Sequence, residues 1–207
     1  MITIKGRSDG EETKRRILHT AAVLFAQKGY GAVSMNEVCT AAEVSKGSLY
    51  HHFPSKDELF LYVVEEDMRK WLQEWEEQRS RISGTEARLF ALGDHYANDF
   101  QNPLTHALEE YARSRTLPDD FRSRLSESFN RVMQVCRELL QEGMDSGYLR
   151  SGDLENSVIA LSGILEGISR VNEIAAIAQT REEIRAYYRS ALQMLLQGMR
   201  AGEESNR

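Results

Sequence analysis

Apolar residues recur at helical spacing along nearly the whole of this 207-residue sequence, and this periodicity limits its fold more than any other feature. No segment shows the clear two-residue alternation of a half-buried strand. Three prolines and fourteen glycines leave long stretches without a helix breaker. The sequence therefore predicts an all-α protein, and its 41% of apolar residues can build a core without disulfide bonds.

Breakers and capping residues divide the periodic segments into separate helices. The first apolar stripe follows Thr13, and Gly29 stands where a left-handed C-terminal cap belongs. Ser55 can cap a long helix, with Glu58 placed to complete a capping box. Later helices are predicted over 85–99, 104–114 and 119–146, and from near Asp153 and near Arg181.

Between Ser34 and Lys56, the sequence predicts two short helices joined by a tight connection. Ser34 can cap the first, with Glu37 closing a capping box. Ser45 can cap the second, which Pro54 stops within about two turns. This order matches a helix-turn-helix unit, in which the second helix enters the major groove of DNA.

The second short helix is polar for its size. Val44, Leu49 and Phe53 supply a small inner face. The remaining residues face outward or sideways, and they are Ser45, Lys46, Ser48, Tyr50, His51 and His52. Gly47 has no structural need inside a short helix, where it costs about 1 kcal/mol relative to alanine. A close approach of this backbone to another molecule would account for the glycine.

The charge distribution points the same way. The chain has a formal net charge of −6, yet residues 1–56 hold eight basic and five acidic residues, a balance of +3. The other residues hold 18 basic and 27 acidic groups, a balance of −9. A basic head on an acidic body suits a protein that binds a polyanion with its N-terminal part.

At these positions the chain resembles the TetR family of bacterial one-component transcription regulators. The resemblance runs from Thr13 to about Tyr62, through TKRRILHTAAVLFAQKGY and VSKGSLYHHFPSKDELF. It implies nine or ten helices, with a helix-turn-helix DNA-binding domain at 1–55 and a helical effector-binding and dimerisation domain at 56–207. It also implies a near-palindromic operator bound by two heads, a homodimer formed through helices at about 153–178 and 181–199, and, as the family's usual mode, repression.

The resemblance also assigns DNA contacts. Carried over residue by residue, it places at the DNA Ser45, Lys46, Gly47, Tyr50, His51, His52 and Lys56. Further candidates for phosphate contacts are Ser34, Lys14 and Arg15. Lys46 can neutralise a phosphate or reach a guanine edge, and Tyr50 and His51 can bind phosphate or pack on a thymine methyl. Neighbouring histidines on a helix point in different directions, so no metal site is expected there.

Aromatic residues in the middle of the chain are candidates for an effector pocket, which the resemblance places among these helices and the dimer pair. The candidates are Trp71, Trp75, Phe90, Tyr96, Phe100, Tyr111, Phe129 and Met133. Candidate polar orienting groups are Asn98, His106, Arg113, Asn130, Gln134 and Asn172. Core packing is the alternative role for each aromatic. The composition favours a hydrophobic or aromatic effector, and no basic cluster demands the phosphates of an acyl-CoA.

The last two predicted helices carry more apolar or small residues than packing against one neighbour requires. The additional positions are Ile159, Gly163, Ile164, Gly167, Ile174, Tyr187, Ala191 and Met194. A second contact surface, most simply a dimer interface, explains them.

Several other classes of protein fit the sequence less well. It contains no phosphate-binding glycine loop, zinc-protease motif or nucleophile elbow, so neither an enzyme nor a cofactor is expected. A helical protein-interaction module remains the other alternative. The longest apolar runs have six residues, and the first residues lack a signal sequence, so we expect a cytoplasmic protein. Cys39 and Cys136 are expected to be buried, reduced thiols.

Overall fold

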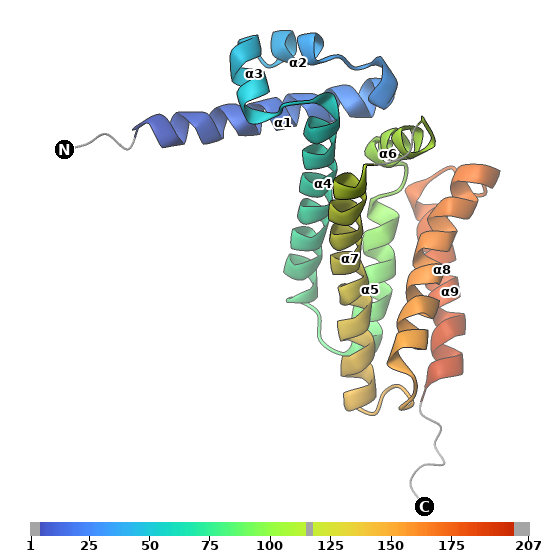
Figure 1. Ribbon diagram of the computed structural model, residues 1–207. Helices are drawn as coiled ribbons and strands as arrows, with labels where there is room; N and C mark the ends of the chain where they lie inside the picture. The colour runs from blue at the N-terminus through green and yellow to red at the C-terminus, as the bar shows by residue number, and fades with distance from the viewer. Residues whose placement is uncertain (1–4, 115–117, 201–207) are drawn as a thin grey trace, which may run out of the picture. The chain divides into compact units, whose positions relative to one another are not determined.

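The described chain is built from α-helices, which confirms the predicted fold class (Figure 1). The computed structural model describes residues 5–114 and 118–200. The helices are α1 (Lys5–Ala32), α2 (Met35–Ala41), α3 (Lys46–His52), α4 (Lys56–Arg79), α5 (Thr85–Asn98), α6 (Pro103–Ser114), α7 (Asp119–Asp145), α8 (Leu154–Ala175) and α9 (Arg181–Met199). Within these ranges, the only strand-like pairing is an isolated bridge between Leu149 and Arg200.

The first helix differs from its predicted bounds at both ends. It begins at Lys5, so Thr13 lies inside the helix, where its hydroxyl donates to the Asp9 carbonyl (2.8 Å). Gly29 has the expected positive φ, 76°, but the residue interrupts α1 and does not end it, since the helix resumes and reaches Ala32.

Both predicted capping boxes form only in part. The Ser34 and Ser55 hydroxyls accept from the backbone N–H groups three residues on, at 3.2 and 3.1 Å. The Glu37 carboxylate, however, pairs with Lys28, and the Glu58 carboxylate pairs with Arg124. A cation outside the helix turn has drawn each carboxylate away from the backbone of its own cap.

The helices pack into two compact units. The first comprises residues up to Lys70 together with 101–128, so it holds α1, α2, α3, α6 and the first parts of α4 and α7. The second comprises 71–100 and the residues from Phe129, so it holds α5, α8, α9 and the rest of α4 and α7. This division by packing does not follow the functional boundary predicted after residue 55, which stays a prediction.

An aromatic cluster forms the core of the first unit. The Phe25 and Phe60 rings meet edge to face at 4.9 Å, and the Tyr30 and Tyr111 rings do so at 4.5 Å. Tyr111 belongs to α6 and is completely buried. The cluster therefore fastens α6 to the same core that supports α1 and the start of α4.

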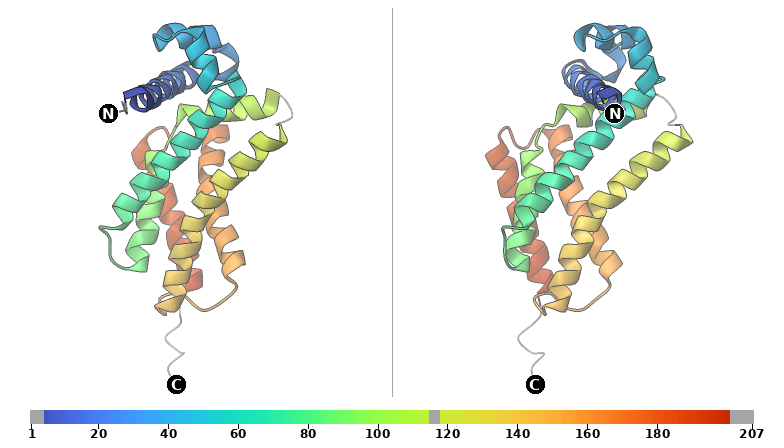
Figure 2. Two further views of the ribbon diagram at one scale, coloured as in Figure 1. Left: turned by 60° about the vertical axis from the view of Figure 1, so that its left-hand side comes forward. Right: turned by 90° about the vertical axis from the view of Figure 1, so that its left-hand side faces the viewer.

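In the second unit, α5 and α9 lie side by side (Figure 2). Gly93 allows their close approach, because a β-carbon there would lie 2.6 Å from a methyl group of Leu192. Asp94, the next residue of α5, accepts two hydrogen bonds from the Arg189 guanidinium. Packing and charge thus fix the register of these two helices together.

A network of ion pairs joins the end of α4 to α5 and α7 in the second unit. Arg79 pairs with Glu142 and, at 2.9 Å, with Glu138, while Arg88 pairs with Glu142 at 2.8 Å. Burial raises the pKa of Glu142, but the hydrogen bonds from Arg79 and Arg88 outweigh burial and leave this pKa below its ordinary value. The folded protein therefore favours the ionised carboxylate.

None of the described helices is long and apolar enough to cross a membrane. Both cysteines are free and buried, as predicted. Burial raises the pKa of Cys136 to about 11, so this thiol stays protonated near neutral pH.

We predict that Glu142→Gln lowers the free energy of unfolding by roughly 1 kcal/mol at pH 7, measured by urea denaturation. Because the folded-state pKa of Glu142 is lowered, its stabilisation is present above the ordinary value of 4.5 and is lost as pH falls. The difference between variant and parent should therefore shrink in acid. Glu76→Gln is the control, since the Glu76 side chain is 68% exposed and lies 3.4 Å from Arg79. Equal effects of the two substitutions would contradict this account.

Candidate nucleic-acid interface and ligand region

The α2–α3 segment is held at each helix start and at the turn by short-range hydrogen bonds. Ser34 caps α2, and the Ser45 hydroxyl caps α3 by accepting from the Ser48 N–H (3.1 Å). In the turn, Glu43 adopts a positive φ of 52°, and the Val44 N–H donates to the Cys39 carbonyl (3.0 Å). These bonds give the tight connection that the sequence predicted.

Helix α3 buries one narrow face and exposes the rest. Leu49 and Phe53 are completely buried. Lys46 and His51 are exposed, and Tyr50 is 48% exposed. The helix therefore presents a cation, a phenol and an imidazole on its outer surface, and all three can contact phosphates or base edges.

Gly47 lies on the exposed part of α3. A β-carbon at this position would have only the Ser45 hydroxyl oxygen near it, at 3.9 Å. Nothing within the described structure therefore requires glycine here, and the close approach of another molecule to this backbone stays a prediction.

The other predicted contact residues differ in how available their polar groups are. Arg15 is exposed on α1. The Lys14 ammonium lies over the Tyr62 ring, 4.6 Å from its centre. The hydroxyls of Ser34 and Ser45 act as acceptors in the helix caps, so each still has its own hydrogen to donate.

Lys56 has a structural role that the sequence did not reveal. Its ammonium group donates to the carbonyl oxygens of Tyr30 and Val33, both at 2.9 Å, and lies 4.1 Å from the centre of the Tyr30 ring. A phosphate contact by Lys56 would compete with these bonds to the end of α1.

The two histidines at the end of α3 pack against one another. The rings of His51 and His52 lie 5.3 Å apart at an angle of 67°. Among the described residues, no group of three or more His, Cys, Asp or Glu side chains could hold a metal ion.

The predicted ligand residues separate into different environments. Tyr111 lies in the aromatic core of the first unit, against Phe121 and Tyr30. The other candidates belong to the second unit. There Trp75 is almost completely buried, whereas Phe129 is 41% exposed. Trp71, Phe90, Tyr96, Phe100 and Met133 are half-buried.

Trp71 packs against both Tyr96 and a histidine, His95, that the sequence pattern did not single out. The His95 ring lies 4.5 Å from the Trp71 ring, and its Nε2 is 3.0 Å from the Trp71 carbonyl oxygen. Burial lowers the pKa of His95, so the neutral imidazole is favoured. His95 follows Leu92 by three residues on the buried stripe of α5, and that spacing could have indicated its position.

Tyr96 and Tyr188, next to His95 in this cluster, lie near acidic side chains. The Tyr96 hydroxyl donates to Glu166 (3.2 Å), and the Tyr96 ring lies 6.0 Å from that of Tyr188. Burial first, and then the charges of Glu166, Asp99 and Glu173, raise the pKa of Tyr188 to about 12, against a hydrogen bond from Ser169. Burial also raises the pKa of Glu166, so the carboxylate in contact with Tyr96 is itself shifted towards its neutral form.

One of the candidate polar groups has a clear structural function. Asn172 is buried, and its side-chain oxygen accepts from the Ala178 N–H (2.6 Å) beyond the end of α8. This bond stabilises the turn in which Ala176 takes a left-handed conformation.

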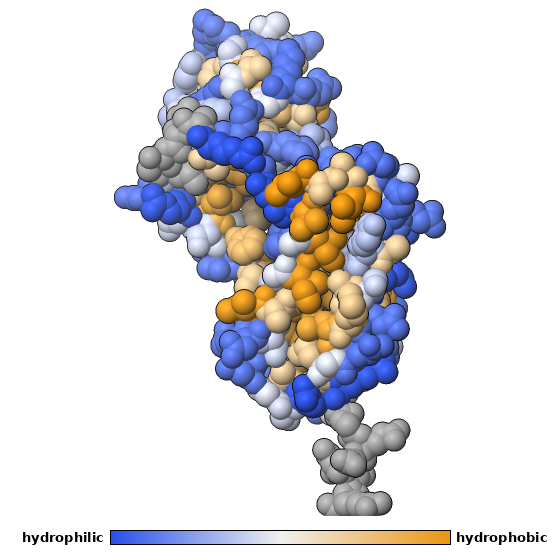
Figure 3. All heavy atoms as spheres, turned by 90° about the vertical axis from the view of Figure 1, so that its right-hand side faces the viewer, coloured by the Kyte–Doolittle hydropathy of each residue, from blue (hydrophilic) through white to orange (hydrophobic). Residues whose placement is uncertain are grey.

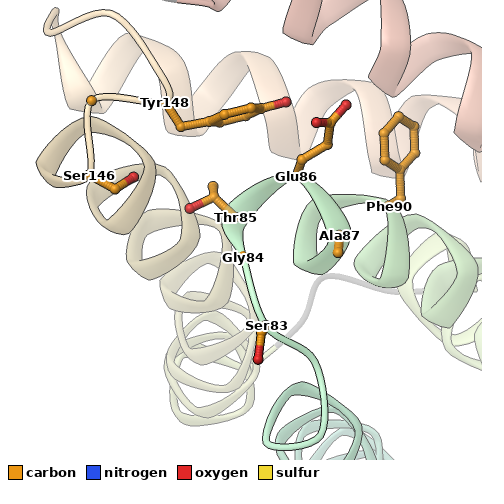
Figure 4. Close-up of a pocket in the computed structure, with 9 residues that line it drawn as sticks. Ser83, Gly84, Thr85, Glu86, Ala87, Phe90, Ser146 and Tyr148 are labelled. Carbon is orange, nitrogen blue, oxygen red and sulfur yellow. The ribbon is translucent and has the colours of Figure 1, made fainter.

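A shallow hollow lies elsewhere in the second unit (Figure 4). Phe90 is its only lining residue among the predicted ligand residues, and the Tyr148 ring extends towards Glu86. Arg200 pairs with Glu86 and lies 5.6 Å from the Tyr148 ring centre. The hollow is open to solvent, so it can enclose little of a small molecule.

Helices α8 and α9 expose a continuous apolar strip (Figure 3). Its exposed members include Ile159 at 64%, Ile174 at 74% and Met194 at 65%. A β-carbon at Gly163 or Gly167 would meet nothing within 4 Å, so packing within the described chain does not explain these glycines. Most of the additional apolar positions of these helices are therefore not used in the core of the second unit.

Comparison with known proteins agrees with these features. The family described as bacterial regulatory proteins, tetR family, matches residues 17–63, and the family described as QacR-like protein, C-terminal region, matches residues 67–201. The transcriptional regulator QacR of Staphylococcus aureus is 24% identical over 135 residues, which cover 65% of this chain and 72% of that protein.

Solved structures share the fold. The regulator FadR of Bacillus subtilis, in complex with stearoyl-CoA, has a TM-score of 0.74 at 17% identity and covers 89% of this chain and 98% of its own. A regulator from Saccharomonospora viridis, in complex with choline, has a TM-score of 0.77 at 19% identity, with coverages of 93% and 100%. The family matches along 17–63 and 67–201 show that the chain belongs to the TetR family of DNA-binding transcription regulators.

Proposed function

We propose that this regulator is a repressor that binds a near-palindromic operator as a homodimer and releases it when a small hydrophobic or aromatic effector binds. The observation that carries the proposal is the exposed polar face of α3, with Lys46 and Tyr50 on a helix fixed by the Ser45 cap and buried Leu49. Since operator DNA lies in the bacterial cytoplasm, the protein acts there.

The outer face of α3 would read the major groove. Lys46 supplies a charge for phosphate or a guanine edge, and Tyr50 and His51 supply hydrogen bonds and apolar contact. Gly47 lets the backbone approach the DNA, and His52 lies at the edge of the same surface. Ser34, Ser45, Lys14 and Arg15 contribute to phosphate binding. Lys56 acts chiefly by holding the end of α1, because carbonyl groups already occupy its ammonium.

The apolar strip of α8 and α9 would form the dimer interface. A strip that exposes Ile159, Ile174 and Met194 is unfavourable in water and becomes favourable when a second copy covers it. Dimerisation would give two α3 helices, which must reach major grooves about 34–36 Å apart on a palindromic site.

The aromatic cluster of Trp71, His95, Tyr96 and Tyr188 is the favoured effector region in the second unit. Aromatic faces attract cations, and the carboxylates of Glu166, Asp99 and Glu173 lie near enough to raise the pKa of Tyr188. These groups favour a neutral or cationic aromatic effector over an anion. The stearoyl-CoA of one fold neighbour therefore fits this cluster less well than the choline of another.

Effector and operator would act on one equilibrium. An effector that favours a conformation in which the two α3 helices no longer fit successive major grooves lowers the affinity for the operator. By linkage, the operator must weaken effector binding by the same factor, commonly about 1–3 kcal/mol of coupling. An effector that binds equally well to free and operator-bound dimer would contradict this mechanism.

The double substitution Lys46→Ala, Tyr50→Ala should weaken operator binding by at least about 30-fold, because base and phosphate contacts contribute about 1–3 kcal/mol each. Fluorescence anisotropy with DNA from upstream of the protein's coding region, against a shuffled duplex at about 0.15 M salt, measures the change. Lys70→Ala removes an exposed lysine of α4 as the control. A double variant that binds like the parent would favour a helical protein-interaction module instead.

Ile174→Glu combined with Met194→Glu should shift the protein from dimer to monomer, because two carboxylates would have to be buried in the interface. Sedimentation velocity measures the oligomeric state, and operator affinity should fall in parallel. Val23→Glu provides the control, since Val23 is also exposed, at 42%, but lies on α1. A stable dimer of the double variant would exclude this strip as the interface.

Three probes of similar size test the effector class: benzyltrimethylammonium, benzyl alcohol and benzoate. The first two should quench the fluorescence of the chain's two tryptophans, and benzoate should not. Tyr96→Ala should weaken benzyltrimethylammonium binding about fivefold by removing one aromatic face. Tyr148→Ala, in the shallow hollow, is the matched control and should leave binding unchanged. Preferential binding of benzoate would overturn the proposed electrostatic selection.

A further inference from the structure

Helix α1 is broken near its end, and a carboxylate from α6 holds the break. The backbone leaves helical geometry at Gly29, where φ is 76°. Glu110 then accepts two hydrogen bonds from consecutive amides, from the Tyr30 N–H at 2.9 Å and from the Gly31 N–H at 3.0 Å. Consecutive backbone N–H groups that point to one side form a concave anion site, and here the anion is a side chain of the protein itself.

The residues on both sides of Tyr30 are suited to this contact. A β-carbon at Gly31 would lie 2.6 Å from a carboxylate oxygen of Glu110, and one at Gly29 would also collide with that carboxylate. The two glycines thus leave the space into which Glu110 reaches. Glycine at position 31 serves this approach alone, because its backbone does not have a positive φ.

A positive charge, that of Lys56, binds carbonyl groups of the same segment. The Lys56 ammonium donates to the carbonyls of Tyr30 and Val33 at 2.9 Å. The break is therefore bound by a cation from the start of α4 and an anion from α6. Because Val33 is followed directly by Ser34, the cap of α2, the break determines where the α2–α3 segment starts.

Helix α6 has other attachments in the first unit that do not involve the break. Asn102 caps it by accepting from the Leu104 N–H (3.0 Å) and donates to Asp67 of α4 (3.0 Å). Ala107 and Tyr111 are buried in the core of the unit. These contacts can hold α6 in place without Glu110, so the carboxylate is not needed merely to dock the helix.

We propose that Glu110 is a positioning residue for operator binding: it fixes the break in α1 and, through the break, the placement of α2 and α3. The inference rests on the proposed DNA-binding function of α3. It does not require Glu110 to touch DNA. It assigns to α6 control over the DNA-binding helices through two hydrogen bonds.

Glu110→Gln tests the proposal with little change in side-chain volume. The carboxylate accepts one N–H on each of its oxygens, which the amide cannot do because its nitrogen is a donor. We expect operator affinity to fall about fivefold at a temperature well below unfolding, with the dimer intact. Glu109→Gln is the matched control on the same helix, where Glu109 pairs with Arg113 at 2.8 Å, and it should leave operator affinity unchanged.

Gly31→Ala approaches the same contact from the other side and leaves the charge in place. It should reduce operator affinity by a similar factor. The double variant should bind the operator no more weakly than the weaker single variant, because both substitutions remove the same contact. This variant also carries the test if Glu110→Gln does not fold. Fully additive effects would overturn the proposal, as would unchanged affinity of both single variants.

Amide hydrogen exchange of Tyr30 and Gly31 in the free dimer separates this inference from the proposed function. Exchange should be slow in the parent and faster in Glu110→Gln, while Glu109→Gln matches the parent. Unchanged exchange would show that the carboxylate does not hold the break and would overturn the inference. Parent protein that binds no DNA, with these two amides protected, would instead count against the proposed function.

Discussion

The proposed function of the first unit depends on keeping a helix of seven residues folded while it presents a polar surface. An isolated helix as short as α3 is unstable in water, and α3 buries only Leu49 along its length. Its stability must therefore come from its surroundings: the Ser45 cap, the turn at Glu43, and buried Phe53 at its end. The aromatic core behind α1 and α4 provides the rigid support that so short a helix cannot provide for itself.

Two features at the proposed functional sites depart from the usual preferences for helix residues and for burial of apolar side chains. Gly47 weakens a helix that is already short, and the exposed strip of α8 and α9 leaves Ile174 in water. Neither feature improves the isolated chain. Both make sense once another molecule is present, DNA at the first position and a second subunit at the other. Departures from local consistency are expected at functional sites.

Much of the fold could be predicted because its signals are local: Ser34, Ser45 and Pro54 mark helix ends within a few residues of themselves. The contacts that the sequence did not reveal join distant residues, as Glu110 joins Tyr30 across 80 positions. Lys56 was predicted only as a DNA contact, because the carbonyls of Tyr30 and Val33 that bind it lie more than twenty residues earlier and no periodicity encodes such a contact. The exposed face of α3 was therefore more predictable than the long-range contacts that hold it.

Two consecutive residues of α9 lie at two different proposed sites, the effector region and the dimer interface. Tyr188 is buried against Tyr96 and bonded to Ser169 (2.8 Å), whereas Tyr187 is 46% exposed beside the apolar strip. An effector that shifts the α9 backbone at Tyr188 would also shift Tyr187, the preceding residue of the same helix, which lies beside the proposed interface. The dimer would then take part in the response as well as spacing the two α3 helices. By linkage, effector affinity would differ between monomer and dimer.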